Sequence, residues 1–585
     1  MCGIAGIVAF NGVVESEKLK AMTDIIVHRG PDGEGQWLNG AHNVGFGHRR
    51  LSIIDLSENG KQPMHYANGR YTITFNGEIY NYIELREKLK HRGYRFVSGS
   101  DTEVLLAMYD LKKETCLEDL DGMFAFAIWD EREQTLFCAR DRFGEKPFHY
   151  YIDKHQFVFA SEIKQFWAYG ISKKTTEKRL RAFINNGEVD DSNEEESTFY
   201  ETIKRLDAAT YMVVTKDKKP VKQKYWSVEV EQSFKGNLRS ASDQFLELLT
   251  DSVKMRLRSD VPVGSSLSGG LDSSSIVMLI DRLKGESVIQ NTFSARFKNF
   301  AKDEGKYIEE VVKACCAINA QYTWPDEDYF LSVFDQVTYH QDEPYGSGSI
   351  VAQYAVMQLA KERNVTVLLD GQGADEYLAG YHSQYYTYLG QLFYNDRKKY
   401  NREYGSYSNL QNLNQPIEDF RSKESLRQQL GRHKRLLLGQ SMPVPANALA
   451  LKLKFDLQTD GLKTLLRYAD RNSMAHSREV RLPFLSHKLV EFVFSLPDDF
   501  KLKEGWSKYV LRNSMQGILP RDICWRTDKI GFEPPQNNWM NSGKVNALVE
   551  KTAKELKLDY VQIPNDARAI SKKWRLLMAS KYLHN

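Results

Sequence analysis

The second residue of the chain is a cysteine whose position suits nucleophilic chemistry. If Met1 is removed, the thiol of Cys2 lies beside a free α-amine, whose reference pKa of about 7.7 to 8.0 suits a general base at neutral pH. One residue would then supply both the nucleophile and its base. Because a lone cysteine near an amino terminus is usually structural, the surrounding residues have to decide whether Cys2 is catalytic.

A second group of residues is suited to holding phosphate. The string SLSGGLDSS at 266–274 follows one expected strand and opens an expected helix. Its glycines would let backbone N–H groups close on phosphate, while the positive end of the helix faces the negative charge. In isolation such a turn more often caps a helix. The chain contains no GxxxxGK[ST] string, which disfavours ordinary transfer of the γ-phosphate.

Two different patterns of secondary structure surround these residues. Between 71 and 161, short apolar runs such as TITF and MFAFAIW alternate with polar turns, and two amphipathic segments lie near 82–91 and 102–113. This pattern predicts antiparallel strands with two inserted helices. From about Ala241, helical segments alternate with single buried strands, which predicts a parallel sheet whose ligand lies at the carboxyl ends of the strands. We therefore expect an α+β domain followed by an α/β domain.

The length of the chain also indicates more than one domain. A chain of 585 residues is too long for one ordinary hydrophobic core. We place the first domain at 1–226, a polar linker at 227–240 and the second domain at 241–585. Within the second domain, the segment at about 382–461 is rich in Tyr, Gln, Asn and basic residues, and we interpret it as a helical excursion of unknown role.

The charge balance argues against a polyanionic partner. The chain has 80 basic and 77 acidic residues, so nothing in its charge calls for nucleic acid or an anionic membrane, and we expect small-molecule substrates. The six cysteines show no disulfide or zinc spacing, and the sequence has neither a signal peptide nor an apolar run of about 18 residues. We expect a cytoplasmic protein.

Motifs near the amino terminus together resemble the N-terminal-nucleophile (Ntn) glutaminase domain of glutamine amidotransferases. They are MCGIAGIVAF at 1–10, HRGPDGEG at 28–35, GHRRLSIIDL at 47–56 and NGEIYN at 76–81. The resemblance implies an antiparallel β sandwich with helices, in which Cys2 attacks the amide of glutamine. It assigns the oxyanion hole to the side-chain amide of Asn76 and the backbone N–H of Gly77, because a tetrahedral oxyanion needs two fixed donors. The residues implied to bind glutamine are Arg50, Asn76, Gly77, Glu78 and Asp101.

The string at 266–274 resembles the PP-loop of ATP pyrophosphatases, an adenine nucleotide α-hydrolase-like fold. A PP-loop holds pyrophosphate, so the implied reaction is attack of a carboxylate on the α-phosphate of ATP to give an acyl-AMP. Asp272 and Asp375 are expected to bind Mg²⁺, which prefers one or two carboxylates together with phosphate oxygens. The residues implied to bind ATP are Leu267, Ser268, Gly269, Gly270, Asp272, Ser273, Ala295, Asp370 and Gly371.

The last third of the chain is similar to the glutamine-hydrolysing asparagine synthetases. The matching strings are LLRYADRNSMAHSREVRLPFL at 465–485, WSKYVLR at 506–512 and RTDKIGF at 526–532. The resemblance runs in order from Met1 to about Trp539, and it implies a homodimer. It also implies that Lys529 neutralises charge at the α-phosphate in the transition state. The residues implied to shape the passage between the two sites are Asp470, Ser473, Arg478 and Glu479.

Two departures from the family pattern concern the acceptor. Where the family string reads SGEGADE, this chain has DGQGADE, so Gln372 takes the place of a carboxylate, and an amide cannot act as a base. Ser486 replaces the aspartate that usually follows PFL. We nevertheless expect Gln372 and Asp375 to contact the acceptor.

We expect asparagine synthesis, in which aspartate and ATP give β-aspartyl-AMP and ammonia then displaces AMP. The ammonia would be released at Cys2 and would travel through a buried channel lined mainly by small and apolar groups. A rival hypothesis is amidation of a different carboxylate, on a sugar acid or a peptide. A ring-closing enzyme that uses no ammonia and a catalytically silent binding protein are disfavoured, because Cys2, Asn76, Gly77 and Glu78 are all present.

Overall fold

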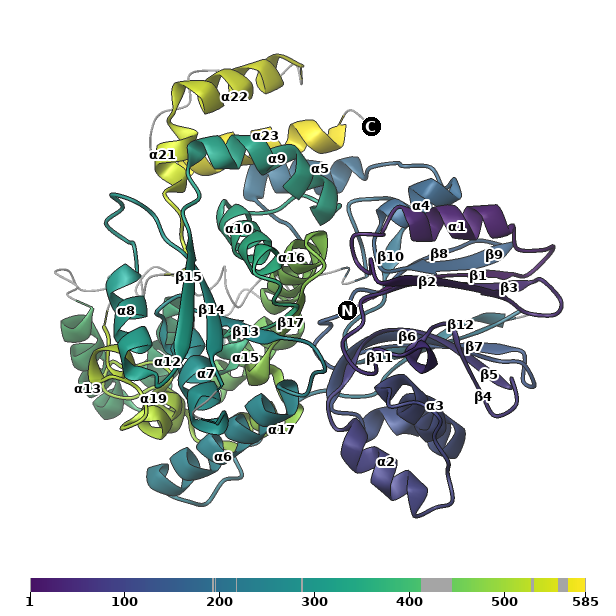
Figure 1. Ribbon diagram of the computed structural model, residues 1–585. Coiled ribbons are helices and arrows are strands. Elements are labelled where there is room, and N and C mark those ends of the chain that lie inside the picture. Colours follow the sequence, from purple (N-terminus) through teal and green to yellow (C-terminus); the bar gives the residue numbers. More distant parts are fainter. Residues whose placement is uncertain are drawn as a thin grey trace.

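The structure of the protein is a computed structural model. It describes residues 2–191, 194, 196–216, 218–285, 288–411, 445–527, 531–555 and 567–583. The chain forms two lobes, and its amino terminus lies between them (Figure 1).

The first lobe contains two stacked antiparallel sheets of six strands each. In spatial order, the first sheet contains β10 (Lys204–Arg205), β8 (His149–Ile152), β9 (Gln156–Ala160), β1 (Gly3–Ala9), β3 (Val44–Arg50) and β2 (Gly33–Leu38). The second contains β12 (Lys218–Lys224), β11 (Thr210–Thr215), β7 (Thr135–Arg140), β6 (Gly122–Asp130), β5 (Tyr71–Ile79) and β4 (Met64–Tyr66). Successive side chains of a strand point to opposite faces, so one face of each sheet contributes to a shared apolar layer that includes Ile4, Phe46, Ala127 and Phe159.

Helices cover the outer faces of both sheets (Figure 1). The first sheet is covered by α1 (Ser16–Asp24) and α4 (Lys164–Tyr169), and the second by α2 (Tyr82–Lys90) and α3 (Asp101–Lys112). The lobe also contains α5 (Glu177–Asn186) and the short helices η1 (Glu58–Gly60) and η2 (Lys113–Glu118). This layering places the amino end of the central strand β1, and with it Cys2, at the border with the second lobe.

The second lobe is built on a five-stranded parallel sheet. Its strands, in spatial order, are β15 (Ile318–Thr323), β14 (Gln290–Ala295), β13 (Val263–Ser266), β16 (Val367–Leu369) and β17 (Glu479–Arg481). Around it lie α6 (Leu238–Arg256), α7 (Leu271–Leu283), α8 (Gly305–Ala314), α9 (Glu327–Gln341), α10 (Ser349–Glu362), α11 (Ala374–Tyr377), α16 (Leu462–Ala475), η4 (Pro483–Leu485), α17 (His487–Ser495), α18 (Asp498–Lys501), α19 (Tyr509–Met515) and α20 (Arg521–Cys524). β17 is an edge strand, and it is the strand of this sheet nearest the first lobe in Figure 1.

The expected fold class is confirmed: an α+β domain with stacked antiparallel sheets precedes an α/β domain with a parallel sheet. The domain boundaries stay a prediction, although the last residues of the expected linker belong to α6, which begins at Leu238. The described parts of the excursion are helical, as α12 (His382–Asn395), α13 (Arg397–Leu410) and α15 (Ala448–Gln458). The chain ends with α21 (Gln536–Met540), α22 (Gly543–Glu555) and α23 (Ala567–Leu583).

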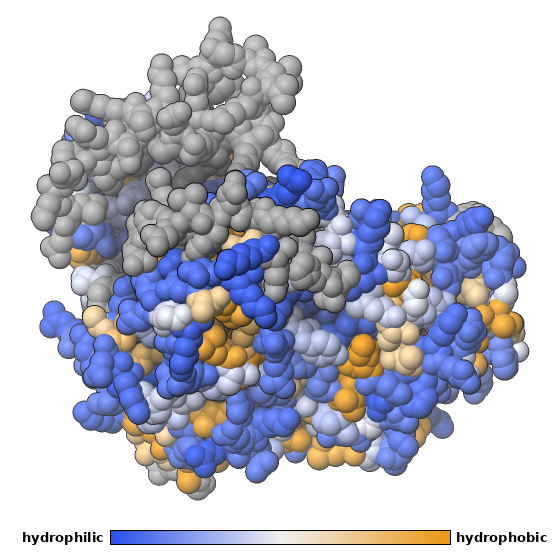
Figure 2. All heavy atoms as spheres, turned by 90° about the horizontal axis from the view of Figure 1, so that it is seen from above, coloured by the Kyte–Doolittle hydropathy of each residue, from blue (hydrophilic) through white to orange (hydrophobic). Residues whose placement is uncertain are grey.

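The described surface is mixed in character. On the face seen in Figure 2, hydrophobic residues form small groups that hydrophilic residues separate. No helix within the described ranges is long and apolar enough to cross a bilayer.

Candidate functional site

Cys2 is buried between the two sheets of the first lobe, where the glutamine pocket is expected. Its backbone N–H donates to Oδ1 of Asn76 at 2.9 Å, and its Sγ lies 3.9 Å from the carbonyl oxygen of Leu51. Burial raises the pKa of the Cys2 thiol, and the charges of Arg50 and Glu78 act on that pKa in opposite directions. Both charged side chains therefore lie within electrostatic reach of the sulfur.

The side-chain amide of Asn76 has an unused donor, and Gly77 beside it allows close packing of two strands. Nδ2 of Asn76 is buried and finds no hydrogen-bond acceptor among the described residues. A buried donor without a partner costs about 1–3 kcal/mol, which a substrate oxygen in the pocket would offset. Any side chain at Gly77 would place its Cβ 2.1 Å from the carbonyl oxygen of Met123. The glycine lets the two strands β5 and β6 approach closely behind the pocket.

The three residues expected to bind the charged end of glutamine lie around this pocket. Arg50 ends β3, and its guanidinium is held by the carbonyl oxygens of Asp55 and Ser57, the latter at 2.9 Å. Asp101 is the first residue of α3 and accepts the backbone N–H of Ile79 at 2.8 Å, while burial raises its pKa to about 6. Burial, followed by the charges of neighbouring carboxylates, raises the pKa of Glu78 well above its usual value.

A cavity of about 340 Å³ lies at the carboxyl ends of β13, β14 and β16. The residues predicted to bind ATP or the acceptor that line it are Leu267, Ser268, Ser273, Ala295, Asp370, Gln372 and Asp375. The phosphate loop itself is tight, because the hydroxyl oxygens of Ser268 and Ser273 lie 3.0 Å apart and Gly269 has a φ of +77°. The predicted PP-loop residues therefore do border a cavity at the strand ends.

The start of α7 combines an uncapped helix end with close packing against the loop after β16. Gly270 is the N-cap of α7 and, lacking a side chain, forms no capping hydrogen bond, so the first N–H groups of the helix are uncapped. A Cβ on Gly371 would lie 2.7 Å from the backbone nitrogen of Ser273. The loop after β16 thus packs directly against the start of α7.

Lys508 joins the two carboxylates that we predicted to bind Mg²⁺. Its Nζ lies 2.5 Å from Oδ2 of Asp272 and 2.7 Å from Oδ1 of Asp375. Burial alone would lower the pKa of Lys508, but the two carboxylates outweigh it and the pKa is raised. Lys508 belongs to the string WSKYVLR, and nothing in the sequence pairs residue 508 with residue 272.

Lys529 lies outside the described residues, so its expected role stays a prediction. Two other residues of the same motif, Gly531 and Phe532, line the cavity at the strand ends. Arg526, where this motif begins, donates to the carbonyl oxygen of Gly269 at 3.1 Å. Part of the RTDKIGF segment therefore contacts the phosphate loop and its cavity.

The acceptor end of the cavity has unusual polar groups. The buried Oε1 of Gln372 has no hydrogen-bond partner within the described ranges. A second cavity of about 490 Å³ adjoins the first, since Tyr381 and Leu465 line both. Six carboxylates line this second cavity: Glu188, Asp190, Asp191, Glu376, Asp456 and Asp460. Burial, helped by Asp375, raises the pKa of Glu376 to about 7.

Arg29 connects the nucleophile to the second lobe. Its two terminal nitrogens bind the carboxylate of Asp470 on α16 at 2.9 Å each, and one of them also binds Glu162 at 2.8 Å. Its Nε donates to the carbonyl oxygen of Cys2 at 3.0 Å. This fully buried guanidinium therefore fixes Cys2 relative to α16. Only its place in the HRGPDGEG motif distinguishes Arg29 in the sequence.

The other residues expected to shape a passage have different surroundings. Ser473 donates to the carbonyl oxygen of Asp470 at 3.1 Å, and Arg478 donates to that of Val365 at 2.9 Å. Glu479 is buried and binds Arg481 at 2.6 Å. Asp470 thus contacts Arg29 of the first lobe, and Glu479 contacts Arg481, which lies near Glu78 of the first lobe.

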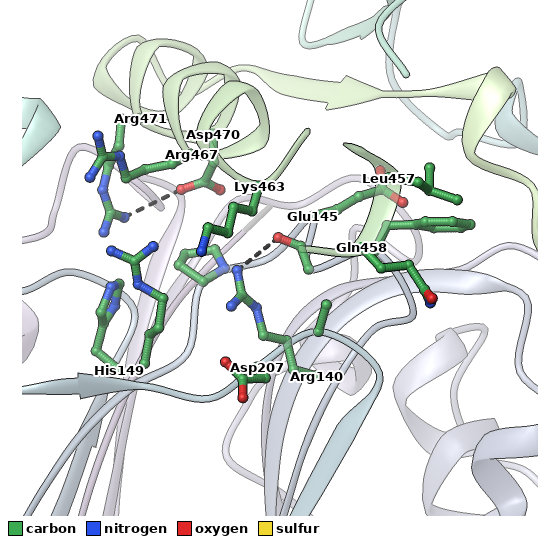
Figure 3. Close-up of a pocket in the computed structure, with 15 residues that line it drawn as sticks. Arg140, Glu145, His149, Asp207, Leu457, Gln458, Lys463, Arg467, Asp470 and Arg471 are labelled. Atoms are coloured by element: carbon green, nitrogen blue, oxygen red, sulfur yellow. Dashed lines mark hydrogen bonds and ion pairs between the residues drawn. The ribbon is translucent and has the colours of Figure 1, made fainter. Parts of the chain in front are cut away.

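The two lobes meet through both charged and apolar groups. Figure 3 shows a cavity between them whose lining includes Arg140 and His149 from the first lobe and Arg467, Asp470 and Arg471 from the second. This lining is mainly charged and polar, unlike the expected channel. An apolar contact across the interface is formed by Tyr80, Met123 and Met474, with Met255 packed against them. The channel stays a prediction.

Comparisons with known proteins agree with this division. A family model described as a glutamine amidotransferase domain matches residues 1–226, and one described as asparagine synthase matches residues 244–581. "Asparagine synthetase [glutamine-hydrolyzing] 1" of Bacillus subtilis is 32% identical over 96% of this chain and 91% of its own length. The chain belongs to the glutamine-hydrolysing asparagine synthetase family.

Other relatives of this asparagine synthetase family member are more varied. A "Putative asparagine synthetase [glutamine-hydrolyzing] 2" of Methanocaldococcus jannaschii is 36% identical over 65% of this chain and 76% of its own. "Amidase chry2" of Gibberella zeae is 27% identical over 94% of this chain and 92% of its own. The expected family is therefore confirmed, while the roles of individual site residues stay predictions.

The Arg29 network predicts an effect of mutation on the stability of this asparagine synthetase family member. Arg29→Met leaves the buried carboxylates of Asp470 and Glu162 without this partner, which we expect to lower the free energy of unfolding by about 3–5 kcal/mol. Urea denaturation followed by tryptophan fluorescence measures it. Arg49→Met is the control, because Arg49 pairs with the exposed Asp24 and Glu34 and should cost less than about 1 kcal/mol. Equal losses in the two variants would contradict the role of Arg29.

Proposed function

We propose that this chain is a glutamine-dependent asparagine synthetase. It would convert aspartate, ATP, glutamine and water into asparagine, AMP, pyrophosphate and glutamate. The observation that carries the proposal is the presence of two differently built sites in one chain: Cys2 against Asn76 in one domain, and a strand-end cavity bordered by a phosphate loop in the other. Their connection through Arg29 and Asp470 supports joint use of the two sites.

In the first site, the thiol of Cys2 would attack the amide carbon of glutamine. Once Met1 is removed, the nitrogen that now donates to Asn76 is the α-amine, and it would accept the thiol proton and pass it to the leaving ammonia. Nδ2 of Asn76 and the N–H of Gly77 would stabilise the oxyanion. The residues that would select the zwitterionic end of glutamine are Arg50, Glu78 and Asp101.

In the second site, the β-carboxylate of aspartate would attack the α-phosphate of ATP, and pyrophosphate would leave into the phosphate loop. The uncapped N–H groups at the start of α7 would hold the leaving phosphates. Asp272 and Asp375 converge on one lysine beside the cavity, and such a pair of carboxylates fits Mg²⁺. Mg²⁺ would supply neutralisation of phosphate charge, and Lys508 and Lys529 would add positive charge.

Ammonia would have to cross the interface between these sites. We propose that it crosses where Tyr80 and Met123 meet Met474. Met123 lies directly behind the oxyanion-hole residue Gly77, and Met474 belongs to the helix that carries Asp470. We also propose, from the family resemblance, a homodimer that works in the cytoplasm.

A second candidate function differs from the first in the acceptor that is amidated. Gln372 and the adjoining acidic cavity favour an acceptor that differs from free aspartate, such as the carboxylate of a sugar acid or a peptide. Incubation with amide-¹⁵N-glutamine, ATP, Mg²⁺ and a panel of acids, followed by mass spectrometry, identifies the amidated product. We expect labelled asparagine. A higher kcat/KM for another acid would instead establish the second candidate.

Replacing the nucleophile should separate the two half-reactions. We expect Cys2→Ala to lower glutamine-dependent asparagine synthesis by more than about 10³-fold while synthesis from added ammonia persists, because the second site is intact. Amino-acid analysis and pyrophosphate release measure the two activities. Cys316→Ala, at an exposed cysteine, is the control and should keep both. Loss of ammonia-dependent synthesis in Cys2→Ala would show that the sites are not separable.

Replacing Lys508, which lies between Asp272 and Asp375, should impair the second site and leave the first intact. We expect Lys508→Met to lower aspartate-dependent pyrophosphate release by about 10²–10³-fold, because one fixed positive charge is lost beside the phosphates. Glutamine hydrolysis at Cys2 should persist. Lys503→Met is the control, since Lys503 lies five residues earlier and contacts the ring of Tyr509. Unchanged pyrophosphate release in Lys508→Met would exclude Lys508 from this step.

A further inference from the structure

We propose that Arg481 is a positioning residue that couples glutamine binding in the first domain to nucleotide binding in the second. The inference rests on the proposed function, because it takes Glu78 as a ligand of glutamine and the strand-end cavity as the ATP site. Arg481 is the last residue of β17 and is fully buried. It contacts both sites, through its side chain on one side and its backbone on the other.

The side chain of Arg481 faces two carboxylates. Its Nε binds Oε1 of Glu479 at 2.6 Å, while its Nη2 lies 3.6 Å from Oε1 of Glu78. The second distance is too long for a hydrogen bond. Nη2 of Arg481 and Oε2 of Glu78 are both buried and without hydrogen-bond partners in the described part of the chain. A donor and an acceptor with unused capacity therefore lie just beyond bonding distance, across the domain interface.

The backbone of Arg481 supports the nucleotide cavity. Its carbonyl oxygen accepts the N–H of Asp370 at 3.0 Å, and Arg481 pairs in register with Leu369 at the end of the parallel strand β16. Asp370 lines the cavity, and the following Gly371 packs against the backbone of Ser273 in the phosphate loop. A small displacement of Arg481 would thus reach the phosphate loop through one peptide unit.

The rest of the guanidinium is firmly held. Nη1 donates to the carbonyl oxygens of Arg256 and Arg258 at 2.8 and 2.6 Å, and the group lies 5.6 Å from the ring centre of Tyr80. Burying an ion costs several kcal/mol unless charges and hydrogen bonds compensate. Nε and Nη1 of Arg481 have hydrogen-bond partners, but Nη2, which faces Glu78, has none among the described residues. A ligand at Glu78 would therefore change the contacts of Arg481 on this side.

Glutamine would provide such a change through its ammonium group. Burial and the neighbouring carboxylates, Glu479 first among them, raise the pKa of Glu78. Nε of Arg481 binds Glu479 at 2.6 Å, whereas Nη2 lies 3.6 Å from Glu78. Without glutamine, Arg481 is therefore paired with Glu479. An ammonium bound at Glu78 favours the ionised carboxylate, which then competes with Glu479 for Arg481. Binding energy at one site is in this way transmitted to the strand that supports the other.

Such coupling has to be reciprocal in the binding free energies. If glutamine strengthens nucleotide binding by a factor, ATP strengthens glutamine binding by the same factor, which is typically about 5–150-fold. The Cys2→Ala chain should bind glutamine without hydrolysing it, because it lacks the proposed nucleophile, so both affinities can be measured by calorimetry. We expect the Kd of glutamine in the Cys2→Ala chain to fall by about 5-fold or more when ATP and Mg²⁺ are saturating and aspartate is absent.

The decisive variant carries Arg481→Met together with Glu479→Gln, which avoids leaving Glu479 as an unpaired buried charge. In the Cys2→Ala chain, we expect this double variant to bind glutamine with the same Kd, within about 2-fold, whether or not ATP is present. Arg70→Met is the control, because its guanidinium pairs with Asp130 inside the first domain instead of with Glu78. It should keep the full effect of ATP.

Arg481→Lys keeps the charge but loses the planar fork, and it decides the question if the double variant does not fold. We expect it to reduce the effect of ATP on the glutamine Kd. The proposal is overturned if ATP leaves that Kd unchanged in the Cys2→Ala chain, or if either Arg481 variant keeps the full effect. The proposed function is tested by a different experiment: it fails if product analysis finds no labelled asparagine. The binding measurements would still show whether Arg481 couples the two sites.

Discussion

The structure depends on one buried guanidinium, that of Arg29. It binds Asp470 through two nitrogens and also contacts Glu162 and the carbonyl oxygen of Cys2. A planar fork with several donors is needed to satisfy these groups at once, which a lysine could not do. The chain therefore positions Cys2 by a contact with the second lobe, and the surroundings of Cys2 depend on the assembled lobes.

The charged character of this interface has a physical cost and a physical use. A buried ion pair adds little net stability compared with well-packed apolar groups. Yet Lys164 of the first lobe binds Asp342 of the second, and Arg205 of the first binds Glu343 of the second, so such pairs cross between the lobes. The two charges of each pair meet in only one relative position of the lobes. Such pairs specify relative position, and two sites that exchange ammonia require a fixed relative position.

The sequence predicted the parts of the site that are local in the chain. Asn76 and Gly77 are neighbours on one strand, and the phosphate loop lies between one strand and the next helix, so a short string indicates both. Lys508 and Arg481 could not be assigned in this way. Lys508 meets Asp272 from 236 residues away, and Arg29 meets Asp470 from 441 residues away. No periodicity or composition pairs such residues, because tertiary packing alone brings them together.

The position of β17 explains why the two sites can be so close. It is the edge strand of the parallel sheet, and an exposed edge strand has unpaired backbone groups that must be covered or protected. Here charged residues of β17 face the first lobe, with Arg481 directed at Glu78. The neighbouring strand β16 ends at the nucleotide cavity. Docking the glutamine domain at this edge therefore both protects the sheet and leaves a single strand between Glu78 and the loop that contacts the phosphate site.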